Sequence, residues 1–545
     1  MIKVTFKDMT SIDNDFPMTA REILVKTNFP KRESTVACRV NRIQRPLSWM
    51  ISMDSSLEFI TTDSVEGLEV YNRTLAFILT SAATRICGIR LRLSQSMHYS
   101  YYYESPDGEI TPSQYNEIYD EMKRMVKEGV PLVREELSMD RARAVMISQG
   151  YSDKEQLLRW ADNDPVILYK CEGIYDFFGG ALSDTASAIQ TFELSLYSGG
   201  LFLSGPTLSD SRKVIPLQTS AKTFKLFADY AKWLDNLSLG TMDRIHKIVA
   251  EGHSRDLIMV CEALHTKILS KVADNIESRP QVRLLCLAGP SSSGKTTSSR
   301  RLRVQLLTSG INSATIELDN YFVNRESTPK DLDGKYDFEA LEALDTDLIN
   351  EHLADLVEGK EVDVPKFDFV SGVRTKGYKL KLDPGQLLVI EGIHGLNEII
   401  SESIPSENKY GIFICPLTGT NLDLHNRVGT TDIRLLRRII RDYKTRGNSP
   451  EKTLTQWPSV IRGSLRHIFP YQENADTLFN TSLAYELPVL KGYVLPLLKG
   501  IDEDSPVFGE AQRLLSILDF VPVIPSDDVP NLSIIREFIG GSCFA

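Results

Sequence analysis

The 545-residue sequence predicts a multidomain α/β protein. β-grasp-like and α+β N-terminal domains are expected to precede a domain built on a mostly parallel sheet. Three observations support this fold class. The chain is longer than one hydrophobic core usually serves, its first sixty or so residues look like short strands around a helix, and from Gln281 onward apolar runs alternate with helical patterns, as in parallel α/β sheets.

Composition places the chain among ordinary globular proteins, with 42% hydrophobic and 25% charged residues. No apolar run is long enough to span a bilayer and the first residues lack the apolar core of a secretion signal, so we expect no membrane partner and a cytoplasmic location. A formal net charge of −11 argues against nucleic-acid partners. The seven cysteines form no C-x-x-C pair. Nothing in the sequence fixes the oligomeric state, and a homo-oligomer is compatible with it.

The first unit is predicted to be a small β-grasp domain over residues 1–62. Residues Ile2–Phe6 alternate apolar and polar side chains, as on a half-buried strand. Thr19 and Glu22 have the spacing of a capping box and predict a short helix over Ala20–Lys26. Further strand patterns follow this helix. The order of strand, helix and strands suggests the β-grasp arrangement.

A second, α+β unit is predicted over residues 63–203. Thr111 and Gln114 supply the N-cap and the capping glutamine of a helix. The apolar stripe of that helix stops at Gly129, a residue type that commonly ends helices.

These two units together resemble the N-terminal region of threonyl-tRNA synthetases, in which a TGS domain precedes an editing domain. The resemblance covers Met1–Leu203 and rests on the run Tyr101–Glu104, the helix after Thr111 and the run Tyr175–Phe177. It implies that the first unit is TGS-like and that the second is editing-like.

The editing pocket of that family uses an H-x-x-x-H pair and a later C-x-x-x-H pair. The matching positions of this sequence are Tyr71, Leu75, Phe178 and Leu182. These side chains supply neither zinc ligands nor histidine acid–base chemistry. We therefore expect a degenerate site that does not deacylate tRNA.

Residues 204–280 are predicted to form a helical connector, in which apolar side chains recur at helical spacing. The polar, proline-terminated run Asp274–Pro280 marks its end. A parallel-sheet domain is expected over residues 281–500. The C-terminal segment, residues 501–545, has no role that the sequence indicates.

A phosphate-binding loop opens the parallel-sheet domain. The stretch Gly289–Thr297 contains the pattern G-x-x-x-x-G-K-[ST] and follows the apolar run Arg283–Ala288, so a chance match is the weaker interpretation. Backbone N–H groups can wrap a phosphate there, Lys295 would reach the β- and γ-phosphates, and the Thr296 hydroxyl would bind Mg²⁺. The residues expected to hold the nucleotide are Gly289, Ser291, Ser292, Ser293, Gly294, Lys295, Thr296 and Thr297.

Two acidic residues follow further apolar runs of the predicted sheet. Asp319 follows Ala314–Leu318 and is our candidate for the catalytic base, the alternative being a helix N-cap. Glu391 follows Leu387–Ile390 and would hold Mg²⁺, because a carboxylate at the end of a buried strand is costly unless it binds something.

Four arginines recur at i, i+3, i+4 and i+7 and therefore share one face of a helix: Arg434, Arg437, Arg438 and Arg441. Such a stripe is often only a solvated face. Apolar residues can anchor the opposite side here, which favours a lid that offers arginines to phosphates.

The parallel-sheet domain resembles the uridine kinase and phosphoribulokinase family of P-loop kinases. The resemblance covers Arg283 to Asn480. Its motifs, in chain order after the phosphate-binding loop, are Asp319–Phe322, Tyr336–Ala340, Pro365–Phe369 with Arg374, Glu391–Ile393 and Arg434–Asp442 with Gln456. The resemblance implies a kinase that uses ATP and Mg²⁺, with Lys295 and Asp319 catalytic and Arg441 on the nucleotide. The substrate-binding positions that it implies are Asp337, Phe367, Arg374, Arg438 and Gln456.

The resemblance therefore implies an ATP-dependent kinase that phosphorylates the 5′-hydroxyl of a ribonucleoside. Uridine and cytidine are the first candidates for this substrate. Three family positions that contact the nucleoside are changed here, to Phe367, Gly372 and Asn448, so the base preference is expected to be relaxed or shifted. Two alternatives remain open. One is a sugar kinase of the phosphoribulokinase type, and the other is a non-catalytic regulatory or RNA-binding protein that binds ATP.

Overall fold

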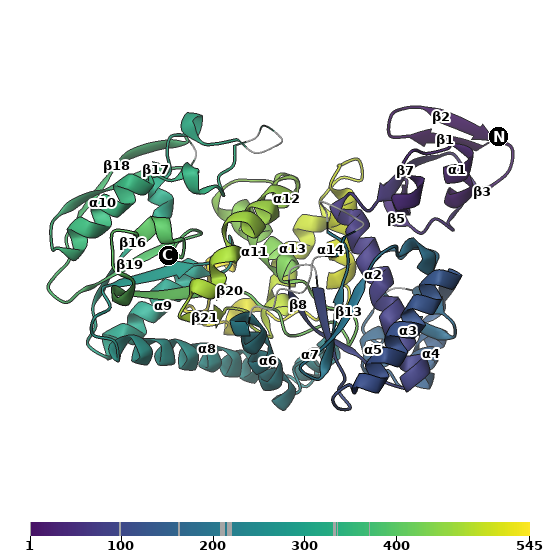
Figure 1. Ribbon diagram of the computed structural model, residues 1–545, viewed down its shortest axis with the longest axis horizontal. Coiled ribbons are helices and arrows are strands. Elements are labelled where there is room, and N and C mark those ends of the chain that lie inside the picture. The colour runs from purple at the N-terminus through teal and green to yellow at the C-terminus, as the bar shows by residue number, and fades with distance from the viewer. Residues whose placement is uncertain are drawn as a thin grey trace.

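The structure, a computed structural model, describes residues 2–97, 100–161, 164–207, 213–214, 221–330, 334, 336–369 and 371–544. The molecule is elongated, with the N-terminal units at one end and the parallel sheet at the other (Figure 1). Among the described residues, no helix is long and apolar enough to cross a membrane.

The N-terminal unit is a five-stranded sheet in the order β2-β1-β7-β4-β5, with β1 and β7 parallel. Helix α1 (Ala20–Lys26) begins after Thr19, whose side chain forms the expected capping box with Glu22, and buries Ile23 and Leu24 against the sheet. The strands are β1 (Ile2–Phe6), β2 (Ser11–Asn14), β4 (Thr35–Val40), β5 (Ile43–Arg45) and β7 (Ser55–Thr61), and the short pair is β3 (Met18–Thr19) with β6 (Met50–Ile51).

The second unit combines four helices with two antiparallel sheets, ordered β10-β11-β12 and β13-β14-β9-β8. Its helices are α2 (Val65–Ala82), α3 (Pro112–Glu128), α4 (Met139–Ser148) and α5 (Ser152–Leu158). Its strands are β8 (Arg92–Met97), β9 (Ser100–Glu104), β10 (Val133–Leu137), β11 (Val166–Cys171), β12 (Ile174–Asp176), β13 (Glu193–Tyr197) and β14 (Gly200–Ser204). Thr111 and Gln114 cap α3, and Gly129 ends it with φ 65°.

In the described part of the segment that follows the second unit, the structure has three helices: α6 (Ala221–Asn236), α7 (Met242–Ala250) and α8 (Ser254–Glu277). The long helix α8 lies along the parallel sheet and packs against α9 (Figure 1). Residues 208–212 and 215–220 of the predicted helical connector lie outside the described residues.

The C-terminal half contains a five-stranded, wholly parallel sheet in the order β16-β19-β15-β20-β21. Its strands are β15 (Leu284–Ala288), β16 (Ser313–Glu317), β19 (Leu387–Gly392), β20 (Lys409–Cys415) and β21 (Thr477–Asn480). Alternate residues of β15 face opposite cores, Leu284 and Cys286 towards α10 and Leu285 and Leu287 towards α8 and α9. Burial on both faces explains the continuous apolar strands. The multidomain α/β fold that the sequence predicts is confirmed.

Helices and one hairpin complete this half. The helices are α9 (Lys295–Thr308), α10 (Thr346–Val357), α11 (Thr430–Thr445), α12 (Pro450–His467), α13 (Glu486–Lys499), α14 (Phe508–Leu518) and α15 (Arg536–Ile539). The hairpin is formed by β17 (Val362–Asp368) and β18 (Val373–Leu380), and it stands beyond the edge strand β16 (Figure 1).

The largest hydrophobic core crosses the predicted domain boundaries. It includes Leu157 and Phe177 from the second unit, Ile245 from α7, Leu436 from α11 and Leu514 from α14. The boundaries at 62, 203, 280 and 500 remain predictions, but the units on either side of the last three share this core.

A buried charge cluster joins the second unit to the segment between β20 and α11. The Lys154 ammonium lies 2.7 Å from a carboxylate oxygen of Asp176 and 2.7 Å from one of Asp423. The His425 Nδ1 atom lies 2.5 Å from the other oxygen of Asp176. Lys154 and both aspartates are at most 1% exposed, so each charge depends on its partners for stabilisation.

We expect Lys154→Met to destabilise the protein by about 3–5 kcal/mol, because it leaves two buried carboxylates without their cation. Urea unfolding followed by circular dichroism measures this change. The control is Lys170→Met, which alters a side chain that is 41% exposed and should cost less than about 0.5 kcal/mol. Equal midpoints for the two variants would show that the cluster contributes no net stability.

Candidate active site

The phosphate-binding loop lies between the end of β15 and the start of α9. Its glycines are required by geometry: a Cβ on Gly289 would lie 2.1 Å from the carbonyl oxygen of Ile414, and Gly294 has φ 87°. Ser292 also adopts a positive φ, of 62°. This curled backbone leads directly into the N-terminus of α9, where N–H groups lack intrahelical partners and suit a phosphate group.

Thr296 and Glu391 meet because β15 and β19 are parallel neighbours that end in register, Ala288 beside Gly392. The Thr296 hydroxyl donates a 2.5 Å hydrogen bond to Glu391. Burial raises the pKa of Glu391 to about 7, although the Thr296 hydrogen bond opposes this shift. A hydroxyl beside a carboxylate is an oxygen donor set that suits Mg²⁺.

Lys295 begins α9 and points back over the loop, where its ammonium donates a 3.3 Å hydrogen bond to the carbonyl oxygen of Pro290. Burial lowers the pKa of Lys295, and the carboxylates of Glu391 and Asp319 oppose the shift. Both carboxylates therefore act electrostatically on the lysine. Lys295, Thr296 and Glu391 therefore have side chains that fit a nucleoside triphosphate with Mg²⁺.

Asp319 lies in a short 3₁₀ turn, Leu318–Tyr321, immediately after β16. It is exposed, and the N-cap of this turn is Glu317. The alternative interpretation, that Asp319 is itself the cap, therefore finds no support in this turn. Glu317 of β16 pairs in register with Glu391 of β19. The turn that holds Asp319 therefore lies at the carboxyl ends of the strands, where the phosphate-binding loop also lies.

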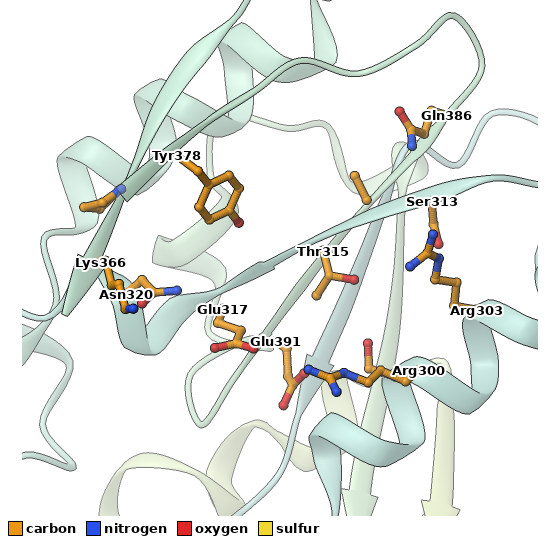
Figure 2. A pocket seen from close by; sticks show the side chains of 13 residues that line it. Arg300, Arg303, Ser313, Thr315, Glu317, Asn320, Lys366, Tyr378, Gln386 and Glu391 are labelled. Carbon is orange, nitrogen blue, oxygen red and sulfur yellow. The ribbon is translucent and has the colours of Figure 1, made fainter. Parts of the chain in front are cut away.

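A cavity of about 640 Å³ reaches Glu391 from the edge-strand side of the sheet. Figure 2 shows Thr315, Glu317 and Glu391 facing Arg300 of α9, with Tyr378 of the β17–β18 hairpin on the opposite wall. The cavity is not lined by Asp319, Asp337 or Arg438. Its wall does include Lys366, the chain neighbour of Phe367.

Two arginines of the predicted lid are buried and donate hydrogen bonds to the backbone of the phosphate-binding loop. This differs from the expectation that all four arginines offer their side chains to phosphate groups. Arg437 is fully buried and forms an ion pair with Glu486, and it also donates to the carbonyl oxygen of Ser292 at 3.3 Å. Arg434, equally buried, donates to the carbonyl oxygen of Ser291 at 3.1 Å. Both therefore donate to the backbone of the loop.

The other two arginines, Arg438 and Arg441, are partly exposed and are oriented by the buried carboxylate of Asp442, at 3.2 and 3.0 Å. Arg438 also donates to the Ser291 hydroxyl of the loop at 3.1 Å. Arg446 lies 3.5 Å from the same carboxylate. One buried acid thus pairs with three guanidinium groups, of which that of Arg438 also contacts the loop.

The predicted substrate-binding residues come from several elements. Asp337 accepts from the Glu339 backbone N–H at 3.0 Å and lies 3.8 Å from the imidazole of His467. Phe367 is buried in a cluster of aromatic rings. Its neighbours are Phe322 at 5.5 Å and Phe369 at 5.1 Å between ring centroids.

Of the remaining two predicted residues, Arg374 lies directly opposite Phe367 in the register of the β17–β18 hairpin. Arg374 pairs with Asp345, the N-cap of α10, at 2.7 Å. Gln456 is exposed on α12. Their roles in substrate binding stay predictions.

Sequence reasoning gave no role to Glu339, whose carboxylate faces the site. Burial raises the pKa of Glu339, while the charges of Arg438, Arg434 and Lys295 lower it. One of its carboxylate oxygens is buried without a hydrogen-bond partner. The sequence signal that could have identified Glu339 was its position two residues after Asp337, within the motif Tyr336–Ala340.

The four positions that the synthetase resemblance assigns to an editing pocket lie in a hydrophobic core of the second unit. Tyr71, Leu75 and Leu182 are at most 1% exposed and belong to one core cluster, and Phe178 packs against it. The Tyr71 hydroxyl accepts from the backbone N–H groups of residues 190 and 191 at 2.9 Å and donates to the carbonyl oxygen of residue 191 at 2.6 Å. Burial raises the pKa of Tyr71 to about 12, so this hydroxyl stays protonated.

Comparisons with known proteins agree with both halves. The phosphoribulokinase / uridine kinase family model matches residues 284–485. A uridine kinase of Staphylococcus aureus is 32% identical over 182 residues, 33% of this chain and 77% of that protein. One of Chloroflexus aggregans is 28% identical over 198 residues, 36% of this chain and 85% of that protein. A threonine–tRNA ligase of Thermotoga petrophila is 29% identical over 203 residues, 36% of this chain but 31% of the ligase.

The parallel sheet and the glycine-constrained phosphate-binding loop define an α/β protein of the P-loop class. The chain belongs to the phosphoribulokinase / uridine kinase family. Its N-terminal region is similar to threonine–tRNA ligases, so the expected fusion of the two is confirmed. The chain spans less than a third of the ligase's length.

We expect no hydrolysis of mischarged tRNA specific for threonine, because the four pocket positions are packed apolar groups and a protonated tyrosine. Release of the amino acid from labelled aminoacyl-tRNA should match the rate in buffer alone. An editing-competent threonine–tRNA ligase is the positive control. Deacylation that disappears in Tyr71→Phe would contradict this prediction.

Proposed function

We propose that the protein is an ATP-dependent nucleoside kinase that transfers the γ-phosphoryl group of ATP to the 5′-hydroxyl of a ribonucleoside, with Mg²⁺ as cofactor. The observation that carries this proposal is the Thr296–Glu391 contact of 2.5 Å beside Lys295 at the end of the phosphate-binding loop. A kinase needs charge neutralisation and a positioned carboxylate at this place.

The roles of the residues follow from their positions. Thr296 and Glu391 would hold Mg²⁺, and Lys295 would neutralise the β- and γ-phosphates. Bound ATP with Mg²⁺ would supply the phosphoryl group and reduce the charge on the transferring oxygens. Asp319 would take the proton from the acceptor hydroxyl, and its exposure leaves it accessible to that hydroxyl. Arg438 and Arg441, oriented by Asp442, would bind phosphate oxygens.

The acceptor side supports a ribonucleoside with a weakly specified base. Asp337 would hold the ribose hydroxyls. The walls near it are aromatic: Phe338 is 40% and Phe369 is 52% exposed. Aromatic faces stack on any base, whereas strong discrimination needs buried polar groups that a wrong ligand would leave unpaired. Phe367 and Gly372 offer no side-chain hydrogen bond to a base.

We expect Lys295→Ala and Asp319→Asn both to abolish turnover, the second by roughly 10²–10⁴-fold, the usual contribution of a general base. Only Lys295→Ala should also weaken ATP binding, because only the lysine reaches the nucleotide phosphates. Isothermal titration calorimetry and a coupled ADP-release assay separate the two effects. Equal loss of ATP affinity in both variants would remove Asp319 from the role of base.

The test of the proposed function is kcat/KM across uridine, cytidine, adenosine, guanosine, inosine and ribulose 5-phosphate. We expect several nucleosides to be phosphorylated and the sugar phosphate to be a poor acceptor. Asp337→Ala should lower kcat/KM about 10–100-fold, the cost of a lost charged hydrogen bond, and Phe367→Tyr should change it far less.

Three other outcomes would refute the assignment. A strong preference for ribulose 5-phosphate would favour the sugar-kinase alternative. Activity that is unaffected by Asp337→Ala would separate this residue from the acceptor. Protein that binds ATP but phosphorylates none of these acceptors would favour the non-catalytic alternative.

A further inference from the structure

Glu537, in the C-terminal helix α15, reaches the N-terminus of α9. One oxygen of its carboxylate accepts hydrogen bonds from both the backbone N–H of Thr297, at 3.2 Å, and the Thr297 hydroxyl, at 2.8 Å. The two residues are 240 positions apart in the sequence. Thr297 directly follows Thr296, the last residue of the phosphate-binding motif, and is among the residues predicted to hold the nucleotide.

The N–H group of Thr297 belongs to the first turn of α9, where backbone donors have no intrahelical partner. Such donors suit an anion, and in a phosphate-binding loop they cradle the α- and β-phosphates. The Glu537 carboxylate is an anion that uses one of these donors. The carboxylate therefore occupies the N–H and hydroxyl donors of Thr297 that could otherwise bind a phosphate oxygen.

The charge of Glu537 also acts on the ionisable groups of the site. Burial is the main cause of the raised pKa of Glu391 and of the lowered pKa of Lys295. Glu537 adds to the first shift and opposes the second. Two residues that are predicted to meet Mg²⁺ and phosphate thus respond to this carboxylate.

The backbone around Glu537 is anchored on both sides, so the side chain can leave Thr297 without unfolding the segment. Ile534 is fully buried and packs at Gly294, where a Cβ would lie 2.5 Å from its Cγ2 atom. Phe538 is 1% exposed and lies 5.1 Å from the Arg437 guanidinium. The Lys444 ammonium of α11 donates to the carbonyl oxygen of Ile539.

We propose that Glu537 competes with the nucleotide for the N-terminus of α9 and so acts as an autoinhibitory contact that the C-terminal segment places in the phosphate site. The proposal rests on the proposed function, because it requires the loop to bind nucleotide phosphates. Two anions cannot share the Thr297 donors, so phosphate binding displaces the carboxylate. Because α15 packs against α11, the displacement occurs beside the helix that carries Arg438 and Arg441.

The experiment measures the Kd of ATP and of pyrophosphate by isothermal titration calorimetry in the full-length protein, without an acceptor. The variants are Glu537→Gln, which keeps the size of the side chain and removes its charge, and Glu537→Ala. We expect both ligands to bind about 2–30-fold more tightly, the range that corresponds to one charge at a helix N-terminus. The rise in Tm that each ligand produces should grow in parallel.

The matched control is Asp527→Asn, which removes one negative charge from an exposed position of the same C-terminal segment. Its Kd values should equal those of the wild type. Thermal unfolding without ligand establishes that each variant is folded, and if Glu537→Ala does not fold, the near-isosteric Glu537→Gln decides the question.

Unchanged or weaker binding of ATP and pyrophosphate in the Glu537 variants would overturn the proposal and leave Glu537 as a helix cap only. An equal gain in Asp527→Asn would also overturn it, because the effect would then be one of net charge. If wild type and all variants bind neither ligand, the proposed nucleotide site itself fails. ATP binding in every variant without a gain removes only the competition by Glu537.

Discussion

The buried ion pair between Arg437 and Glu486 is the interaction on which the site depends. It places a guanidinium directly beneath the phosphate-binding loop, where Arg437 also donates to the carbonyl oxygens of Ser292 and Thr481. The Thr481 hydroxyl in turn donates to the carbonyl oxygen of Ser293 at 2.6 Å. Carbonyl groups that turn down towards these donors leave the N–H groups of the loop to face the other side, which is the side a phosphate requires. Removing either charge would leave its partner buried and alone.

The sequence predicted the elements whose signals are local. The capping box of Thr19 and Glu22 located α1 to the residue, and the loop motif located the start of α9, because caps and glycine spacing depend on neighbouring residues. The sequence could not show that Arg434 and Arg437 are buried while Arg438 and Arg441 are partly exposed. Helical spacing shows that four side chains share a face, but only the packing of α11 against the loop and α13 decides which of them are buried.

The contacts that sequence reasoning missed join distant parts of the chain. Glu537 meets Thr297 across 240 positions, and Asp423 meets Lys154 across 269. No local pattern distinguishes such acids from solvated ones, because their partners are chosen by tertiary packing. In the second unit the opposite holds. The residues at the editing positions already predicted a site without that chemistry, and in the structure they lie in a core where the Tyr71 hydroxyl accepts from the backbone N–H groups of residues 190 and 191.

The Lys154 cluster also bears on how the fused chain is made. During synthesis the N-terminal part leaves the ribosome first, and Lys154 and Asp176 must wait for Asp423 and His425 to be translated before the cluster is complete. Until Asp423 and His425 are in place, water must solvate the charges of Lys154 and Asp176. Neither part of the chain can therefore complete this cluster alone. A chain divided between residues 176 and 423 would yield two fragments, each exposing charged groups that are buried in the whole protein.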